Sequence, residues 1–477
     1  MTLLNTHASA TLTPTQNAEA ARAGFDAGIT RPLDWRRRQL RALDRLLEEN
    51  GAAFEDALYS DLGKPPIESF LAEIGSVRNE IALTLRNLDR WTRPKRVKVQ
   101  LSMKPATAEI IREPLGTVLV IAPWNYPVHL LFMPVVAAIA AGNAVVVKPS
   151  ELAPATSSLV ARLVPGYLDT QAIRVVEGAV AETTELLSLP WDHIFYTGNA
   201  AVGRIVMQAA ATHLSPVTLE LGGKSPVFID PSADIEGAAH WLAWGKYLNA
   251  GQTCVAPDYV MTTSDVVPRL VAALEREITE LYGADPQKSK DFGRVVSERH
   301  VDRLVALLPE SGAAIGGISD RADRYLAPTV LTDVQLDAPV MQEEIFGPVL
   351  PILTVGGVDE AIRIVNDRDK PLALYVFSDD KNVQQAFLDR TSSGSVGINA
   401  PILQLGVSTL PFGGVGASGM GSYHGEFGIR TFSHERAVLR KSGRGTLLRL
   451  AQPPFTDKKI RMLRGRGSTA GGPSDTQ

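Results

Sequence analysis

Short runs of apolar residues alternate along the chain with longer segments of helical periodicity. The clearest apolar runs are 117–122, 144–147, 172–176 and 193–197. Runs of this length are typical of strands buried on both faces, and their alternation with helical segments predicts a parallel sheet. The alternation resumes at 225–230 and continues less regularly to about residue 420. We therefore predict an α/β fold with two parallel-sheet domains that meet near residues 216–224.

The first 92 residues follow a different pattern. Residues 1–20 lack the basic start and apolar core of a signal peptide, and we expect a short flexible arm at the N-terminus. Residues 15–92 predict helices. In the segment 33–47 leucines recur near one helical face. We interpret the arginines at 36–38 as a solvated face of that helix rather than as a site for an anionic partner.

Residues 97–111 alternate between polar and apolar side chains and contain Pro105 near their centre. This pattern predicts a β-hairpin at the surface, and residues 430–441 are the candidate for a matching third strand. Such strand pairs often form contacts between subunits. The tail 440–477 carries nine Lys and Arg residues against two Asp. We expect this tail to be partly disordered and solubilising, with contact to anionic lipid or nucleic acid as the alternative.

The composition excludes several classes of protein. Hydrophobic residues make up 45% of the 477 residues and charged residues 21%, as in ordinary soluble globular chains. The net charge of −4 argues against a dedicated nucleic-acid binder. The single cysteine excludes internal disulfides and a cysteine-based zinc site, and it favours a reducing, cytosolic compartment. Prolines at positions 123, 127 and 134 interrupt the apolar stretch 116–147, which argues against a membrane span.

Two residues are candidates for catalytic roles, one as a nucleophile and one as a general base. Cys254 lies in NAGQTCVAP, where small and polar neighbours indicate a loop rather than a packed core. A thiol attacks as the thiolate, so it needs surroundings that lower its pKa. Glu220 lies in the apolar run VTLEL, where burial would raise its pKa and make it a usable general base. The alternatives are an inert buried thiol and a carboxylate satisfied by backbone groups at a strand end.

Several polar residues lie where predicted strands end. Asn125 lies in PWNYP, Lys148 in KPSE and Gly198 in TGNAAVG. Together with Glu220 they fall at the carboxyl ends of strands, where parallel sheets bind their ligands. A fixed Asn side chain at such a position can donate to an oxyanion. Gly198 and Gly203, at the start of a helix, would allow a phosphate to approach the backbone closely.

The sequence also excludes two common nucleotide and hydrolase motifs. TGNAAVG has the spacing G-x-x-x-x-G rather than the dinucleotide fingerprint G-x-G-x-x-G, and it lacks the Lys and Ser/Thr of a P-loop. GGKS at 222–225 lacks the first P-loop glycine, because residue 218 is Thr. Around Ser418 the nucleophile elbow G-x-S-x-G fails, because residue 420 is Met. A nucleoside triphosphatase and a serine hydrolase therefore lack their motifs at these places.

Seven motifs occur in a fixed order: PWNYP, KPSE, FYTGNAAVG, LELGGKSP, NAGQTCVAP, EEIFGP and PFGGVGASGMGSYHG. In this order the chain resembles the aldehyde dehydrogenase superfamily over residues 15–455. The YHG ending, AAGNAVVVKPSE and the short N-terminal arm are most similar to the class 3 branch, which includes fatty, aromatic and coniferyl aldehyde dehydrogenases. The resemblance implies NAD(P)-dependent oxidation of medium- or long-chain aliphatic or aromatic aldehydes to carboxylic acids.

The resemblance implies three catalytic residues. Cys254 would be the nucleophile that forms a thiohemiacetal and then a thioester. Glu220 would activate the water that hydrolyses the thioester. Asn125 would supply the side-chain half of the oxyanion hole, with the backbone N–H of Cys254 as the other half. Two alternatives are a CoA-acylating enzyme, which generally lacks the hydrolytic Glu, and a non-catalytic protein that keeps the fold.

The resemblance also implies a coenzyme site in an unusual Rossmann variant that lacks the dinucleotide fingerprint. Lys148 and Glu151 would hold the adenosine ribose, and Glu344 and Phe346 would hold the nicotinamide ribose and ring. The remaining residues that match cofactor-binding positions are Trp124, Gly198, Asn199, Gly203 and Gly222. The charge of Glu151 favours NAD, because it repels a 2′-phosphate, with NADP as a second coenzyme. No metal is expected.

Finally, the resemblance implies a domain organisation. The expected parts are an NAD-binding domain (1–96 and 113–219), a catalytic domain (220–422), bridging or oligomerisation strands (97–112 and 430–441) and a basic tail (442–477). The expected substrate is a small-molecule aldehyde. We expect a cytoplasmic homodimer with no nucleic-acid partner and no stable membrane anchor.

Overall fold

The computed structural model describes residues 12–442, 449 and 451–464. Most of the predicted N-terminal arm, and residues 443–448, 450 and 465–477 of the predicted basic tail, lie outside the described residues. The chain divides into two compact units. One consists of residues 1–88 and 114–432, and the other of residues 89–113 and 433–477. Each unit is described by itself below.

Residues 15–92 form helices, as predicted. The elements are α1 (Pro14–Asp26), α2 (Leu33–Glu49), α3 (Gly51–Leu62), α4 (Pro66–Ser69), a π-helical turn (Phe70–Ile74) and α5 (Gly75–Thr92). The start of α1 corrects the expected flexible arm. Thr13 and Gln16 form a reciprocal capping box, so the chain is helical from Pro14 rather than flexible to residue 20.

The interpretation of the arginines at 36–38 is wrong for Arg36. This side chain is buried in α2, and its guanidinium donates to the backbone oxygens of Thr30, Arg31 and Ala140. A guanidinium has five donors, so several carbonyl oxygens can replace its lost hydration. Arg36 therefore ties α2 to the end of α6 (His129–Ala141) instead of facing solvent.

The first sheet has six strands in the order β16-β7-β6-β3-β4-β5. Its strands are β3 (Thr117–Ile121), β4 (Ala144–Lys148), β5 (Ile173–Val175), β6 (His193–Thr197), β7 (Val217–Glu220) and β16 (Gly419–Met420). Strands β3 to β7 pair in parallel, and β3, β4 and β6 are buried along their whole length, as their apolar runs predict. Helices α6, α7 (Pro154–Tyr167), α8 (Val180–Leu187) and α9 (Ala200–His213) connect them.

The strand order reverses at β3, which has β4 on one side and β6 on the other. The turn after β3 carries Trp124 and Asn125, and the turn after β6 carries Gly198 and Asn199. Crevices at such switch points are the usual ligand sites of parallel α/β sheets. The short strand β16 was not predicted. It pairs antiparallel with β7, where Gly419 lies opposite Glu220.

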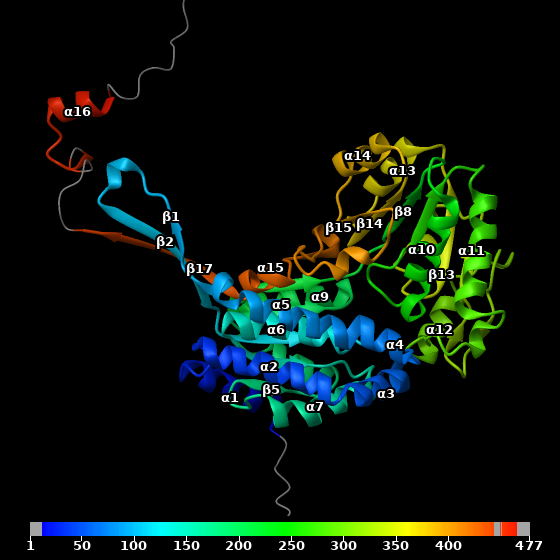
Figure 1. Cartoon of the computed structure of the whole chain (residues 1–477), viewed down its shortest axis with the longest axis horizontal. Coiled ribbons are helices and arrows are strands. Elements are labelled where there is room, and N and C mark those ends of the chain that lie inside the picture. The colour runs from blue at the N-terminus through cyan, green and yellow to red at the C-terminus, as the bar shows by residue number, and fades with distance from the viewer. Residues whose placement is uncertain (1–11, 443–448, 450, 465–477) are drawn as a thin grey trace, which may run out of the picture. The chain divides into compact units, whose positions relative to one another are not determined.

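The second sheet also has six strands, in the order β12-β13-β9-β8-β14-β15. Its strands are β8 (Pro226–Ile229), β9 (Tyr259–Thr262), β12 (Thr329–Leu331), β13 (Val349–Thr354), β14 (Ala373–Phe377) and β15 (Ser395–Ile398), and all its pairs are parallel. Helices α10 (Ile235–Tyr247) and α11 (Val267–Tyr282) lie together, apart from α13 (Val358–Asn366) and α14 (Lys381–Arg390) (Figure 1). The predicted α/β fold with two parallel sheets is confirmed.

The second unit contains the predicted hairpin. Strands β1 (Lys95–Val97) and β2 (Ala106–Pro114) pair antiparallel, and β17 (Ser433–Lys441) lies beside β2. Ion pairs link β2 and β17, including Arg112 with Glu435 at 3.1 Å and Arg436 with Glu113 at 3.2 Å. The third strand is therefore confirmed, although it begins at Ser433, because residues 430–431 still belong to helix α15 (Gly425–Thr431).

Part of the basic tail is helical, and its last residues, 465–477, lie outside the described residues, so partial disorder of the tail stays a prediction. Residues Asp457–Arg464 form helix α16, with Asp457 in its first turn and Arg461 and Arg464 in its last turn. Charges in these places complement the helix dipole. Among the described residues, no helix has both the length and the apolar character needed to cross a membrane.

Candidate active site

The loop that carries Cys254 has an unusual backbone. It follows α10 through the turn η3 (Leu248–Gly251), in which Asn249, Ala250 and Gly251 have φ angles of 52°, 53° and 76°. Left-handed conformations cost roughly 1–3 kcal/mol at residues other than glycine, and they persist only where the surroundings enforce them. Gly251 is required here, because a Cβ atom would lie 2.3 Å from the Gly347 carbonyl oxygen.

Buried hydrogen bonds enforce this conformation. The Gln252 amide nitrogen donates to the carbonyl oxygens of Asn249 (3.0 Å) and Arg294 (2.9 Å), and its amide oxygen accepts from the Val296 N–H at 2.9 Å. Beyond the cysteine, the Tyr375 hydroxyl donates to the Val255 carbonyl oxygen at 2.7 Å. Cys254 is thus held between two anchored neighbours, and it is partly exposed.

The surroundings of Cys254 favour the protonated thiol. Burial raises the pKa of the thiol, and the nearby carboxylates of Glu344 and Glu220 raise it further. Hydrogen bonds from the backbone N–H groups of Cys254 and Val255 act in the opposite direction but do not outweigh these causes. The expected lowering of the cysteine pKa is therefore absent from this arrangement, so the thiol must lose its proton to an acceptor before it attacks.

Glu220 is the last residue of β7 and only 2% exposed. Among the described residues, neither of its carboxyl oxygens has a hydrogen-bond partner. The alternative of a carboxylate satisfied by backbone groups is therefore wrong. Burial alone raises the pKa of Glu220 well above its ordinary value. A buried carboxyl group without partners, next to a thiol, is suited to proton transfer.

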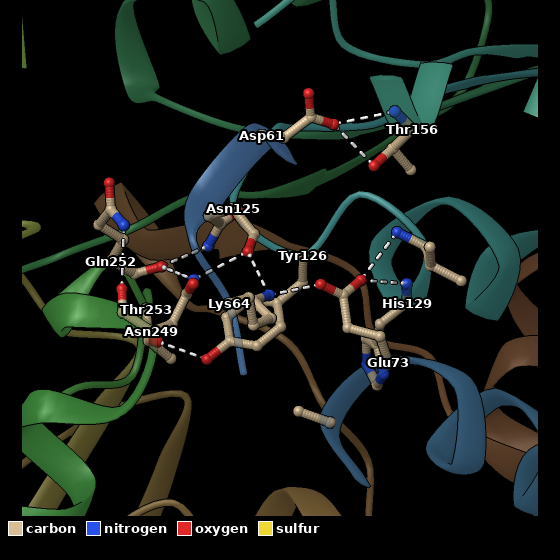
Figure 2. Close-up of polar contacts among 12 residues, drawn as sticks. Asp61, Lys64, Glu73, Asn125, Tyr126, His129, Thr156, Asn249, Gln252 and Thr253 are labelled. Carbon is tan, nitrogen blue, oxygen red and sulfur yellow. Dashed lines mark hydrogen bonds and ion pairs between the residues drawn. The ribbon is translucent and has the colours of Figure 1, made fainter. Parts of the chain in front are cut away.

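Asn125 is buried and points at the cysteine loop. Its side-chain amide nitrogen donates to the Gln252 carbonyl oxygen at 3.0 Å, two residues before Cys254. Its backbone oxygen accepts from the Asn249 side chain at 2.8 Å (Figure 2). Because an amide carries two N–H donors, one of them is left for an oxyanion.

A charged pair lies at the end of β4. The Lys148 ammonium nitrogen is 2.6 Å from a Glu151 carboxylate oxygen, with the Lys148 side chain buried and the Glu151 side chain 43% exposed. Burial is the largest single influence on the Glu151 carboxyl group and acts to raise its pKa, but the hydrogen bond from Lys148, a backbone hydrogen bond and the charge of Lys148 together outweigh burial, so the pKa is lowered. The pair therefore presents both a donor and an anionic acceptor, which suits the hydroxyl groups of a ribose.

The glycines near the start of α9 are explained by contacts within the protein. A Cβ atom at Gly198 would lie 2.2 Å from the Tyr196 hydroxyl, and one at Gly203 would lie 2.9 Å from a Leu221 methyl carbon. Asn199 caps α9, because its side-chain oxygen accepts from the Val202 N–H at 3.0 Å. The cap leaves a helix N-terminus at the switch point of the first sheet, a common place for phosphate.

Glu344 lies against Gly222, and Phe346 lies against Trp124. The Glu344 carboxyl group covers Gly222, and one of its oxygens is buried without a partner among the described residues. Burial, and then the charge of Asp258, raises the pKa of Glu344 to about 8. The rings of Trp124 and Phe346 meet edge to face, with centroids 5.3 Å apart. The structure thus gathers all four residues at one side of the cysteine loop.

Residues 3–438 match the aldehyde dehydrogenase family. The chain belongs to this family. It is 51% identical over 435 residues to mouse aldehyde dehydrogenase family 3 member B2, covering 91% of each chain. It is 49% identical to human aldehyde dehydrogenase family 3 member B1, covering 93% of this chain and 95% of that protein. The fold matches the substrate-bound state of Staphylococcus aureus AldH with a TM-score of 0.92 at 42% identity, over 96% of this chain and 100% of that one.

These findings confirm the resemblance to the class 3 branch. The protein is an NAD(P)-dependent enzyme that acts on aldehydes. The residues at the site fit such a coenzyme, because Glu344 offers an unpartnered buried oxygen and the Lys148–Glu151 pair offers groups that bind ribose hydroxyls. In the part of the chain that the structure describes, no cluster of three or more His, Cys, Asp or Glu residues is arranged to hold a metal ion.

The sequence analysis missed the residues that support this aldehyde dehydrogenase site. The Lys224 ammonium nitrogen lies 2.5 Å from an Asp258 carboxylate oxygen and also donates to the Val340 and Glu343 carbonyl oxygens. The other Asp258 oxygen accepts from the Ile345 N–H at 3.0 Å. This buried pair fixes the backbone on both sides of Glu344. Its only sequence signal is that Lys224 lies in the motif that contains Glu220, and that Asp258 directly follows the motif that contains Cys254.

Proposed function

We propose that this aldehyde dehydrogenase oxidises medium- or long-chain aliphatic or aromatic aldehydes to carboxylic acids by covalent catalysis at Cys254. The Cys254 thiol passes its proton to the neighbouring Glu220 carboxylate, which releases it to solvent before the hydrolysis step, and the sulfur adds to the aldehyde carbon. The Asn125 amide and the Cys254 backbone N–H donate hydrogen bonds to the resulting oxyanion. The observation that carries the proposal is the hydrogen bond from Asn125 to the Gln252 carbonyl, which puts an amide donor beside the nucleophile. Removal of one such donor typically costs about 10²–10³ in rate.

The coenzyme accepts the hydride when it is bound. Lys148 and Glu151 would hold the adenosine ribose, and Glu344 and Phe346 would hold the nicotinamide ribose and ring. Trp124, Gly198, Asn199, Gly203 and Gly222 make up the rest of the coenzyme site. The negative charge of Glu151 favours NAD. NADP is a second coenzyme, and two relatives at 48% and 47% identity are rat and mouse enzymes named "dimeric NADP-preferring".

Glu220 completes the reaction by taking a proton from the water that hydrolyses the thioester. Its raised pKa supports this role, because a general base works best when its pKa is near the working pH. A CoA-acylating enzyme would need no such base. The unpartnered, buried carboxyl group of Glu220 therefore favours hydrolysis over transfer to a thiol.

The substrate class is supported by the segment after β15. The Tyr375 hydroxyl that anchors Val255 also accepts from the Ile402 N–H and the Gln404 side chain, each at 3.3 Å. This contact places the segment next to the cysteine loop. Leu403, Val407 and Leu410 in the same segment are exposed. Exposed apolar side chains beside a reactive centre suit an apolar aldehyde.

The larger organisation is part of the proposal. We propose that 1–96 and 113–219 bind the coenzyme, that 220–422 carry out catalysis, and that two copies associate through 97–112 and 430–441 in the cytoplasm. The names of two relatives describe them as dimeric, which supports a homodimer. Analytical ultracentrifugation of the full chain tests this state, and a monomeric species across the micromolar range would contradict it.

The test of the activity follows NAD(P)H absorbance with acetaldehyde, hexanal, decanal, benzaldehyde and coniferyl aldehyde, without added CoA. We expect turnover by the wild type, none by Cys254→Ser, and a single burst by Glu220→Gln. Glu310→Gln is the matched control, because Glu310 is exposed on the surface. Turnover that appears only after CoA is added would show an acylating enzyme. Coenzyme binding without any turnover would show a non-catalytic protein.

A further inference from the structure

A buried ion pair is in contact with the backbone of Asn125. The side chains of Lys64 and Glu73 both have 0% exposure, and the Lys64 ammonium group contacts a Glu73 carboxylate oxygen. The same ammonium group donates to the Asn125 backbone oxygen at 3.0 Å and lies 4.1 Å from the centre of the Tyr126 ring. Figure 2 shows the Lys64 side chain between Glu73 and Asn125. The pair is therefore in direct contact with the turn that carries the proposed oxyanion donor.

The second oxygen of Glu73 acts on the same turn. It accepts from the backbone N–H groups of Val128 at 2.8 Å and His129 at 3.1 Å, where α6 begins. An anion at a helix N-terminus satisfies N–H groups that have no partner within the helix. The side chains of Lys64 and Glu73 therefore form hydrogen bonds with the backbone of the segment 125–129.

The backbone is adapted to place Glu73 there. Glu73 lies in the π-helical turn Phe70–Ile74, between α4 and α5, where the Gly75 N–H bonds to the Phe70 carbonyl oxygen five residues earlier. Turns of this kind are rare and are frequent at functional sites. Glu68, in α4, and Glu73, in the widened turn, are both buried. An ordinary helical turn would point residues five apart in different directions.

Stability alone does not explain the pair. Removing two charges from water is costly, and replacing a buried ion pair with apolar side chains of similar size is often neutral or stabilising. A buried ion pair is therefore weak evidence for a purely stabilising role, and the contacts of this pair with the Asn125 turn point to a different one. The Asn125 backbone oxygen is held from two sides, by Lys64 and by the Asn249 side chain. The Asn125 side chain then reaches the Gln252 carbonyl.

We propose that Lys64 and Glu73 are a positioning pair that holds the Asn125 amide where the oxyanion forms. The pair acts through Asn125 and does not contact the substrate. The proposal rests on the proposed function, because it takes Asn125 as an oxyanion donor.

The test is a double-mutant cycle between the pair and Asn125. The variants are Lys64→Met/Glu73→Leu, Asn125→Ala and the combined triple variant, and the readout is the single-turnover rate of NAD(P)H formation. We expect the pair variant to lose roughly 10- to 100-fold in this rate, a fraction of the loss for removal of an oxyanion donor. In the Asn125→Ala background the same change should cost less than about 3-fold, because coupled residues are not additive. The dissociation constant for NAD should stay close to the wild-type value, whereas the melting temperature should fall, because Glu73→Leu leaves the Val128 and His129 N–H groups without their acceptor.

A control separates this role from general damage. Arg78 forms partly exposed ion pairs with Asp44 and Glu48 at 2.8 and 2.9 Å, and the Arg78→Met variant should keep the wild-type rate. If the charge-free pair variant does not fold, the cycle is run with Lys64→Gln. This variant keeps a neutral donor, and we expect a loss of about 3- to 10-fold that again disappears beside Asn125→Ala.

The outcomes distinguish the two proposals. A pair variant with the wild-type rate, or a loss of equal size in both backgrounds, overturns the positioning role. An Asn125→Ala variant with the wild-type rate instead overturns the oxyanion role of Asn125 in the proposed function.

Discussion

Gly222 and Glu344 share one small volume beside the cysteine loop, where a Cβ atom on Gly222 would lie 2.0 Å from a Glu344 carboxylate oxygen. Two carboxyl-bearing segments from distant parts of the chain can meet here only because residue 222 has no side chain. The Gly223 N–H hydrogen bond to the Glu344 carboxyl group fixes the same arrangement. The glycine after the proposed base is therefore a requirement for the proposed coenzyme site.

This relationship predicts the effect of Gly222→Ala. The added methyl group displaces the Glu344 carboxyl group, so we expect the dissociation constant for NAD to rise at least about 10-fold, which corresponds to roughly 1.4 kcal/mol. Titration calorimetry measures it. Gly166→Ala is the control, because nothing lies within 4 Å of a Cβ atom there, and it should bind NAD normally. Normal affinity in Gly222→Ala would contradict the role given to Glu344.

Glu220 predicts how thioester hydrolysis depends on pH. Only the ionised carboxylate accepts a proton, and burial raises the pKa of Glu220 well above its ordinary value. Hydrolysis should therefore be slow at pH 5, where an ordinary glutamate is already mostly ionised, and accelerate at higher pH. The rate of the phase that follows the burst, measured from pH 5 to 9, checks this. In Glu220→Gln the remaining slow rate should lose the acceleration, and an unchanged profile would exclude Glu220 as the base.

Glu344 predicts a pH dependence of stability in the absence of coenzyme. Its pKa is raised to about 8, so between its ordinary value and pH 8 the folded state binds a proton that the unfolded state has lost. This contribution to stability is fully present below the ordinary pKa and is lost as the pH rises towards 8 and beyond. Urea unfolding at pH 6.5, 7, 8 and 9 measures it. The free energy of unfolding should fall less steeply in Glu344→Gln than in the wild type.

Two buried histidines set the lower limit of pH 6.5 for this measurement. The buried imidazoles of His129 and His424 have pKa values lowered to about 4 and about 3 by burial, so they affect stability in the opposite direction at lower pH. Parallel slopes for Glu344→Gln and the wild type above pH 6.5 would show that Glu344 titrates normally.

Glu151 predicts coenzyme preference. Its carboxylate is exposed and its pKa is lowered, so it is ionised at neutral pH and repels a 2′-phosphate. In Glu151→Gln the ratio of kcat/KM for NADP to that for NAD should rise about 10-fold, a change of roughly 1.4 kcal/mol. Steady-state kinetics with saturating aldehyde measure both values. Glu310→Gln, at another exposed carboxylate, is the control and should leave the ratio unchanged.

The sequence patterns predict those features of the structure that depend on residues close to one another in the sequence. The buried strands of both sheets, Glu220 at a strand end and Cys254 in a polar loop are all recognisable within short segments. The predicted lowering of the Cys254 pKa is wrong, because the carboxylates of Glu220 and Glu344 raise this pKa. Both residues come from segments distant in sequence from Cys254, so the sequence around Cys254 does not reveal them. The supporting residues were missed for the same reason. Lys64 meets Asn125 across 61 positions, and Arg36 meets Ala140 across 104.

The left-handed backbone from Asn249 to Gly251 has a consequence for the order in which the protein matures. The residues that hydrogen-bond to this loop lie both before and after it in the sequence. Asn125 precedes it, and Arg294, Val296 and Tyr375 follow it. A chain still leaving the ribosome cannot complete the hydrogen bonds of this turn until residue 296 has emerged, or the bond from Tyr375 to the Val255 carbonyl oxygen until residue 375 has emerged. The reactive thiol is thus assembled late. Recovery of enzymatic activity during refolding should lag behind recovery of helical circular dichroism.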